Sequence, residues 1–243
     1  MTSIYNTLIY LPLYNALVFL TALMPGGDIG LAVVLLTVIV KLILSPLSHK
    51  TITTQKKIKE LEPEITKIKE VHKNDQQTQA MKIMALYKEH EVNPFSGIFL
   101  MFIQIPIIFA LFFVFKSGID LNSPLIYSFI LKPAVISSSF LGIIDLTQKN
   151  IILAILVGVT QFIQVQFSLP PVPTSEKGKD GESFGQDLAK GMNFQVKYVL
   201  PIFIAFVSYG LTAVVSVYWI VNNVFTICHE LYVRRRAIKI IEV

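Results

Sequence analysis

The stretch from Ile29 to Ser48 is an apolar run of membrane-spanning length that carries a single charge, Lys41. About 20 apolar residues cross the hydrocarbon core of a bilayer as a helix. A charged side chain inside such a span costs at least about 2.5 kcal/mol on insertion scales, and it usually faces a bundle interior or a wet cavity. We therefore expect other helices to provide polar surroundings for Lys41, unless Lys41 only snorkels to nearby headgroups.

The overall composition agrees with a membrane protein. The 243 residues are 53% hydrophobic and 15% charged, and the mean hydropathy of +0.61 is too high for an ordinary soluble domain. The net charge of +5 comes from basic residues between apolar spans, which favours a membrane surface over DNA as the partner. The start shows no cleavable signal pattern, so we expect the mature chain to be the whole chain, multi-pass in a prokaryotic plasma membrane.

Apolar and polar segments alternate along the chain, and residues 4–24 are apolar enough either to span or to lie flat. The pattern predicts an all-α integral membrane protein with a five-helix transmembrane core. The segments are an N-terminal helix in 1–28, spans at 29–48, 95–117, 149–169, 193–209 and 211–232, a helical hairpin at 49–94, an outer loop at 118–148 suited to a short interfacial helix, a flexible loop at 170–192, and a basic tail at 233–243.

The orientation follows from the charges. Apolar residues recur at three and four in the hairpin segment, from Ile58 to Ile68 and from Ala80 to Tyr87, which indicates two antiparallel helices. Lysines outnumber acids there, and Arg234, Arg235 and Arg236 follow the last span. By the positive-inside rule we expect the N-terminus outside, and the hairpin, the flexible loop and the C-terminus in the cytoplasm.

Polar residues form stripes on several spans. Thr37, Lys41 and Ser45 share one helical face because they are four residues apart. Hydrogen-bonding groups on other spans either glue helices together or converge on Lys41 to form a wet, positive hollow that receives a peptide segment. The candidates for convergence are Thr37, Lys41, Ser45, Gln104, Gln161, Gln164, Tyr218 and Asn222.

The sequence contains no motif of a known enzyme class. Walker, dinucleotide-binding, HExxH and GxSxG patterns are absent. We expect no catalytic residue, no cofactor and no metal site, because the one cysteine, Cys228, excludes a cysteine cluster and the four histidines fall in segments predicted to be solvated.

The chain resembles the YidC/Oxa/Alb family of membrane protein insertases from about Pro12 onward. The resemblance rests on MALYKEHEVNPFSGIFLMFIQIPIIFALF at 84–112, LTVIVKLILSPLS around Lys41, LEPEI at 61–65, VGVTQFIQ at 157–164 and the terminal VYWIVNNVFTICHELYVRRR. It implies a five-helix core with a groove open to cytoplasm and lipid but closed outside, a mobile hairpin at the mouth, and an outer interfacial helix in 1–28. The large outer domain of some relatives is not expected.

By resemblance, Lys41 occupies the position of the groove cation, which is usually arginine in bacterial relatives. Lysine offers a point charge where arginine offers a five-donor fork. Thr37 matches the polar neighbour of the cation, and Tyr218 with Trp219 matches the aromatic pair of the last helix. The implied substrates are nascent membrane proteins, with the lipid bilayer as a further partner. The basic hairpin and tail suit contact with a ribosome, although topology alone also explains their charges. The sequence leaves open whether the chain acts alone or beside a Sec translocon.

Two other classes remain open from the residues alone. A small ion channel or solute transporter would use the same polar groups, but it requires a hollow that continues to the outer face, and it has no need of a charged hairpin. In a structural scaffold, the Lys41 side chain would only reach the headgroups, and the glutamines would only hydrogen-bond one helix to another.

Overall fold

The computed structural model describes residues 3–73, 75–93, 106–110, 112–114, 119–168, 191 and 193–241 of the chain. Within them the protein is an all-α integral membrane protein, as the sequence predicted. Four helical segments are long and apolar enough to cross a membrane, and they are Asn6–Leu23, Ile29–Glu60, Ile151–Ser168 and Ala213–Arg235. The predicted span at 95–117 lies largely outside the described residues, although its pieces at 106–110 and 112–114 are helical.

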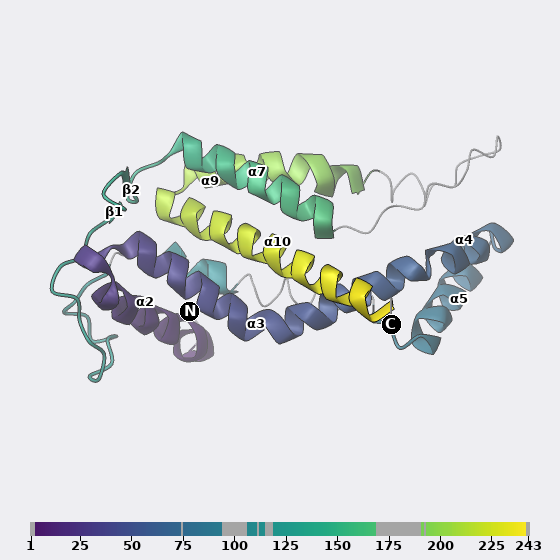
Figure 1. Cartoon of the computed structure of the whole chain (residues 1–243), viewed down its shortest axis with the longest axis horizontal. Coiled ribbons are helices and arrows are strands. Elements are labelled where there is room, and N and C mark those ends of the chain that lie inside the picture. Colours follow the sequence, from purple (N-terminus) through teal and green to yellow (C-terminus); the bar gives the residue numbers. More distant parts are fainter. Residues whose placement is uncertain are drawn as a thin grey trace.

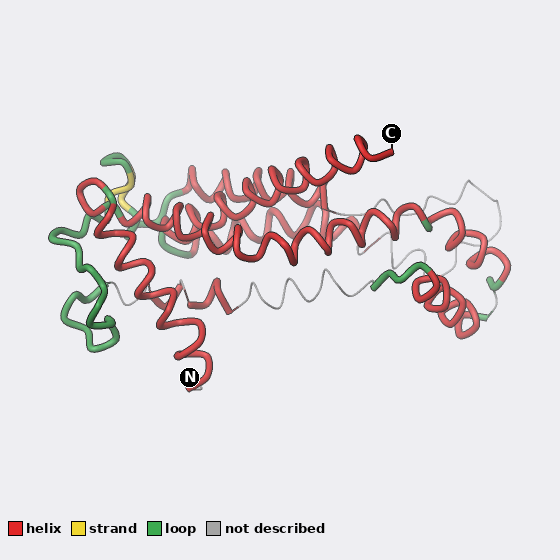
Figure 2. The backbone as a smooth tube through the Cα atoms, turned by 60° about the horizontal axis from the view of Figure 1, so that its bottom comes forward, coloured by secondary structure: helices red, strands yellow, loops and turns green. Residues whose placement is uncertain are grey.

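Helix α10 (Ala213–Ile241) lies at the centre of the bundle (Figure 1). It packs against α3 (Ile29–Glu60) on one side and α7 (Ile151–Ser168) on the other, while α9 (Leu200–Gly210) packs on α7 and α2 (Leu11–Leu23) packs along α3. Figure 2 shows α2 running obliquely to the rest of the bundle. The spatial order is therefore α2, α3, α10, α7, α9, which gives α10 two faces with different neighbours.

Two helical segments adapt to an internal proline in the same way. The π-helical turns η1 (Asn6–Tyr10) and η3 (Gln195–Val199) come just before Pro12 of α2 and Pro201 of α9. Proline lacks a backbone N–H, and its ring clashes with the carbonyl four residues earlier, here in the π turn itself. The wider turn absorbs this clash. As a result α1 (Ser3–Tyr5), η1 and α2 follow one another as one helical rod.

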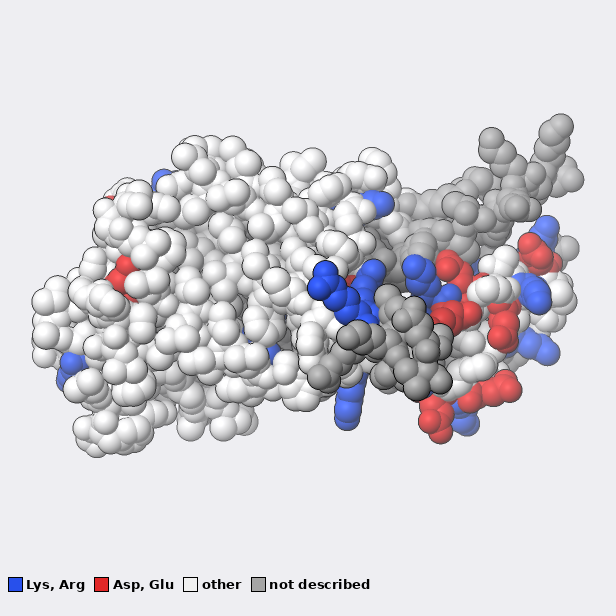
Figure 3. Space-filling view, viewed as in Figure 1, with Lys and Arg blue, Asp and Glu red and all other residues white. Residues whose placement is uncertain are grey.

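The surface of the bundle is apolar, whereas the charges gather at one end. Large side chains such as Ile152, Ile202 and Phe206 are 67–75% exposed, as expected for residues that face lipid tails. Figure 3 shows a nearly uncharged body, with Lys, Arg, Asp and Glu concentrated over α4, α5 and the C-terminal part of α10. We name this the hairpin end, and the opposite end, covered by residues 119–150, the loop end.

The loop end is tied to the start of α3. The Asp28 carboxylate caps α3 by accepting from the Leu31 N–H at 3.0 Å, and it also accepts from the Leu141 N–H at 2.7 Å. Ser137 forms a parallel bridge with Asp28. A short antiparallel ribbon, β1 (Ser139–Phe140) with β2 (Ile144–Asp145), follows. The interfacial helix expected in this loop is therefore wrong for the described residues 119–150, because tertiary contacts hold the backbone in turns and a short ribbon.

A buried amide fastens the same loop to α2. Asn15 is 2% exposed, and its Nδ2 donates to the carbonyls of Leu11 and Leu125, both at 2.9 Å. Its Oδ1 accepts from the Tyr127 N–H at 2.7 Å, and the Tyr14 hydroxyl donates to the Asp120 carbonyl at 3.2 Å. Two of the three bonds made by the Asn15 side chain therefore fix the loop over the end of the bundle.

At the hairpin end, α3 continues without interruption from the predicted span at 29–48 to Glu60. It ends there because Pro63 cannot donate to the Lys59 carbonyl, and α4 (Glu62–Val71) starts anew with this proline in its first turn. Helix α5 (Gln76–Glu89) folds back on α4. Their small core contains Leu61, Ile65, Leu86 and Val92.

Candidate functional site

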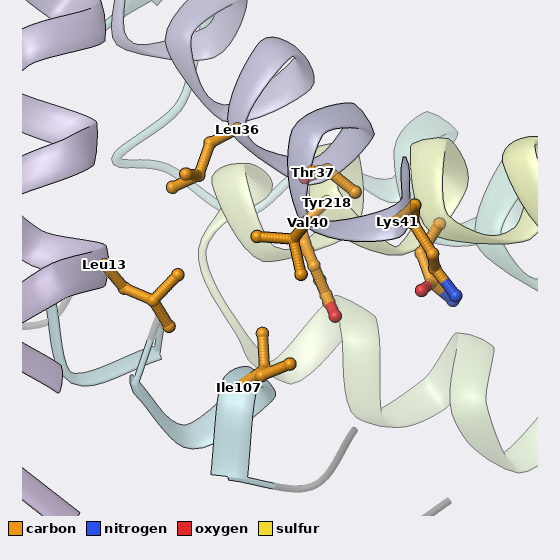
Figure 4. Close-up of a pocket in the computed structure, with 8 residues that line it drawn as sticks. Leu13, Leu36, Thr37, Val40, Lys41, Ile107 and Tyr218 are labelled. Atoms are coloured by element: carbon orange, nitrogen blue, oxygen red, sulfur yellow. The ribbon is translucent and has the colours of Figure 1, made fainter. Parts of the chain in front are cut away.

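A small hollow lies beside Lys41 between α3 and α10. Figure 4 shows Thr37 and Lys41 on α3 and Tyr218 on α10, with Leu13 and Ile107 on the far side. The enclosed space has room for about one water molecule. The lining is Leu13, Leu36, Thr37, Val40, Lys41, Ile107, Tyr218 and Asn222. The polar lining of the hollow thus comes from α3 and α10, and its apolar lining from α2, α3 and Ile107.

Lys41 has a neutral hydrogen-bond partner. Its Nζ donates to Thr226 Oγ1 at 3.2 Å, and this hydroxyl donates in turn to the Asn222 carbonyl at 2.7 Å. Among the described residues no carboxylate lies within ion-pair distance of Lys41. Thr226 therefore holds the cation in place, and no described residue neutralises its charge.

Other predicted site residues flank this hollow. The buried Thr37 donates its hydroxyl proton to the Val33 carbonyl at 2.7 Å. Ser45 lies two turns of helix beyond Thr37 and is half-buried, outside the lining. Trp219, next to Tyr218, packs partly buried against the main core. Gln104 lies outside the described residues.

The structure places the two glutamines in a separate network. Gln161 Nε2 donates to Gln164 Oε1 at 3.0 Å, and Gln164 Nε2 donates to Ser168 Oγ at 2.8 Å. Ser168 then donates to Glu230 Oε2 at 2.9 Å, and the other oxygen of Glu230 pairs with Arg234 at 2.8 Å. Arg234 also donates to the Phe167 carbonyl. Thr37, Lys41, Tyr218 and Asn222 do converge, whereas Gln161 and Gln164 join α7 to α10 elsewhere.

Sequence reasoning missed a second polar stripe on α10. Ser216, Asn223 and Glu230 are seven residues apart and only 1–2% exposed. Ser216 hydrogen-bonds to Ser208 of α9 at 2.8 Å, and Asn223 Nδ2 donates to Thr160 Oγ1 of α7 at 3.2 Å. The seven-residue spacing, and the Glu230 to Arg234 spacing of four, were the available signals. We name these three residues the packing stripe, and Tyr218, Asn222 and Thr226 the hollow stripe.

The described residues contain no group of three His, Cys, Asp or Glu side chains arranged to hold a metal ion. The His49 and His229 rings lie 6.4 Å apart between centroids at the hairpin end. Hydrogen-bond donors and acceptors, together with the Lys41 ammonium, are thus the chemistry that the hollow offers.

Most of the chain matches a known protein family. The family model described as 60Kd inner membrane protein matches residues 19–240. The chain belongs to this family. The predicted resemblance to the YidC/Oxa/Alb insertases is thereby confirmed, because curated relatives of the chain carry the name membrane protein insertase YidC. The matched residues include α3, the hairpin, α7, α9 and nearly all of α10. Both polar stripes of α10 therefore lie within the match.

Individual YidC relatives are similar over most of the chain. One from Citrifermentans bemidjiense is 32% identical over 226 residues, which is 92% of this chain and 36% of the relative. Proteins of the same name from Anaeromyxobacter and Francisella philomiragia are 32% and 31% identical, covering 85% and 86% of this chain and 33% of each relative. The chain spans about a third of the length of these insertases.

Proposed function

We propose that the protein is a membrane protein insertase and chaperone. The hollow beside Lys41 receives hydrophilic parts of nascent membrane proteins, and their apolar segments then pass into lipid. The observation that carries this proposal is a cation inside the bundle that has a neutral partner, Thr226, and no described carboxylate near it. Membership of the insertase family supports the same conclusion.

The charge distribution supports an orientation in a prokaryotic plasma membrane. The hairpin end carries the lysines of α4 and α5 and the arginines of α10, so it faces the cytoplasm by the positive-inside rule. The loop end then faces outward with the N-terminus, and the oblique α2 lies as an interfacial helix at the outer leaflet. Substrates reach the hollow from the hairpin end.

No chemical turnover is needed for this activity. Moving an apolar segment from water to lipid releases roughly 25 cal/mol for each Å² of apolar surface removed from water. The hollow contributes by holding the hydrophilic tail while this transfer proceeds, since its donors replace part of the tail's hydration. Lys41 attracts acidic tails most strongly, because attraction between opposite charges grows in surroundings of low dielectric constant.

The partners follow from the same arrangement. Nascent membrane proteins are the substrates and lipid is the acceptor of their spans. The basic hairpin end suits the anionic surface of a ribosome, and the lipid-facing apolar side chains of α7 and α9 leave surface for a Sec translocon beside the bundle.

The channel and transporter alternative requires a path through the loop end. The bonds from Asp28 and Asn15 to the loop, together with the water-sized hollow, support an outer closure instead. The scaffold alternative has Lys41 reaching headgroups, but its described partner is Thr226 of a neighbouring helix.

Reconstituted insertion tests the proposal. Lys41→Glu should lower the insertion of single-span substrates with acidic tails by about tenfold, equivalent to about 1.4 kcal/mol of lost attraction, while Lys41→Arg should insert nearly normally because it keeps the charge. Ion conductance is measured in the same proteoliposomes. Unchanged insertion in Lys41→Glu, or conductance without insertion by the unaltered chain, would contradict the proposal.

A further inference from the structure

The amide of Asn222 is held in one orientation by a chain of hydrogen bonds that passes through α10. The chain begins at Thr160 on α7, whose hydroxyl lies 2.8 Å from the Leu156 carbonyl and 3.1 Å from the Val157 carbonyl. Carbonyl oxygens only accept, so the single hydroxyl proton points to them. The Thr160 oxygen can then only accept from Asn223, at 3.2 Å.

This fixes both asparagines. Asn223 turns its NH₂ group to Thr160, so its Oδ1 faces Asn222 and accepts from Asn222 Nδ2 at 3.4 Å. The remaining amide atom, Asn222 Oδ1, is buried and has no hydrogen-bond partner among the described residues. Asn222 lines the hollow beside Lys41. A buried acceptor without a partner is rare in folded proteins and calls for a ligand or water.

Asn222 and Lys41 both line the hollow, so its lining contains one residue with an unsatisfied acceptor and one with a strong donor. Lys41 has three ammonium hydrogens, of which one goes to Thr226 in the described residues. An acidic side chain of the tail, which Lys41 attracts, satisfies the cation but leaves Asn222 Oδ1 without a donor. A residue of an extended polypeptide satisfies both, because its own N–H and C=O point to the same side, as they do in a sheet.

We propose that Asn222 is a backbone-recognition residue of the substrate site. Its Oδ1 accepts the N–H of one extended residue in the hydrophilic tail, while Lys41 Nζ donates to the C=O of that residue. Thr160 and Asn223 are positioning residues that set the direction of the Asn222 amide from behind. The water-sized hollow suits the edge of a main chain better than a bulky side chain. This inference rests on the proposed insertase function and explains how tails of different sequence are held alike.

The test replaces one backbone N–H of the substrate by an ester oxygen. A stalled nascent single-span protein carries an α-hydroxy acid at successive tail positions, and a photoreactive residue at position 45, outside the hollow, reports the bound tail. At the tail position seated in the hollow, the ester should lower the crosslink yield about fivefold, the worth of one neutral hydrogen bond. Asn222→Ala should lower the yield of the all-amide tail by the same factor.

The two changes should not add. In Asn222→Ala the ester should have no further effect, because its partner is already gone. Thr160→Val should make the crosslink yield insensitive to the ester, as Asn222→Ala does. Thr160→Ser keeps the hydroxyl, so it should restore the sensitivity to the ester, which a variant that only disturbs packing would not do. An ester effect that persists in full in Asn222→Ala, or no ester effect at any position, would overturn the inference. No crosslink of the unmodified tail at position 45 would overturn the insertase proposal as well.

Discussion

The two polar stripes of α10 differ in how completely their hydrogen bonds are satisfied. In the packing stripe, Ser216, Asn223 and Glu230 each bond to a side chain of α7 or α9, and Glu230 has both a hydroxyl and a guanidinium partner. In the hollow stripe, Asn222 leaves an acceptor without a partner among the described residues, and Thr226 holds a lysine that has no described carboxylate near it. The two stripes share one helix but face different neighbours.

This difference separates stability from function. Fully paired buried polar groups hold helices in register, and removing one partner leaves the other group buried and unsatisfied. Groups left unpaired lower stability unless something binds them, so they mark the position of a ligand. We therefore expect substitutions at Ser216 and Glu230 of the packing stripe to change unfolding. Substitutions at the hollow, and at Asn223, which orients Asn222, should change insertion.

The largest effect on stability should come from Arg234→Ala. It leaves the Glu230 carboxylate, 2% exposed, without its cation. Breaking a fully buried pair costs about 3–5 kcal/mol, and the 42% exposure of the Arg234 side chain lowers our expectation to about 2 kcal/mol. Thermal unfolding of the purified chain measures it, with Arg235→Ala as a matched control. Equal destabilisation by both variants would contradict the packing role of Glu230.

For Lys41→Met we expect stability to be kept and insertion to be lost, the reverse of Arg234→Ala. An apolar side chain of similar length removes a charge from inside the bundle, so stability should stay equal or rise by about 1 kcal/mol. Insertion of acidic-tail substrates should nevertheless fall by about tenfold. Unfolding and insertion are measured on the same preparation, with Ile39→Met on the lipid side of α3 as control. A variant that is both less stable and fully active would reverse the assignment of the two stripes.

A smaller effect is expected at Ser216. Ser216→Ala leaves the buried Ser208 hydroxyl unpaired and should cost about 1 kcal/mol. The double variant Ser208→Ala with Ser216→Ala should recover most of this loss, because both partners are then apolar. Thermal unfolding of the two single variants and the double variant decides the point. Simple addition of the two losses would mean that the serines do not act as a pair.

The smallest effect lies outside both stripes. Asp75 caps α5, and the Thr78 hydroxyl and N–H hold the pKa of its carboxyl below the ordinary 3.8. Because the folded-state pKa is lowered, the capping contribution is present above 3.8 and is lost as pH falls through the lowered value. The protection factors of the α5 amides against hydrogen exchange should fall on this acidification, and Asp75→Asn, which still caps, should remove this pH dependence. A pH dependence that survives in Asp75→Asn would exclude the cap as its cause.

Local spacing explains what the sequence could predict. The four-residue spacing of Thr37 and Lys41, and of Tyr218 and Asn222, indicated two helical faces. The structure brings these two faces together at the hollow. Spacing cannot tell which neighbour a face meets, because that depends on how each helix is rotated in the bundle. Gln161 and Gln164 therefore appeared to belong with Lys41, although they bond toward Ser168 and Glu230. The fold of the loop end depends on contacts between distant residues, such as Asn15 with Tyr127, which local patterns do not encode.

The central claim is that the hollow beside Lys41 receives the hydrophilic tail of a nascent membrane protein. Site-specific photocrosslinking tests it most directly, with the reactive group at position 37 in the hollow, at position 161 in the glutamine network, or at position 203 on the lipid-facing surface of α9. The account predicts strong crosslinks from position 37 to the tail of a stalled substrate and none to the tail from position 203, while position 161 shows how far the groove extends. No crosslink from position 37, together with ion conductance of the pure chain in liposomes, would contradict it.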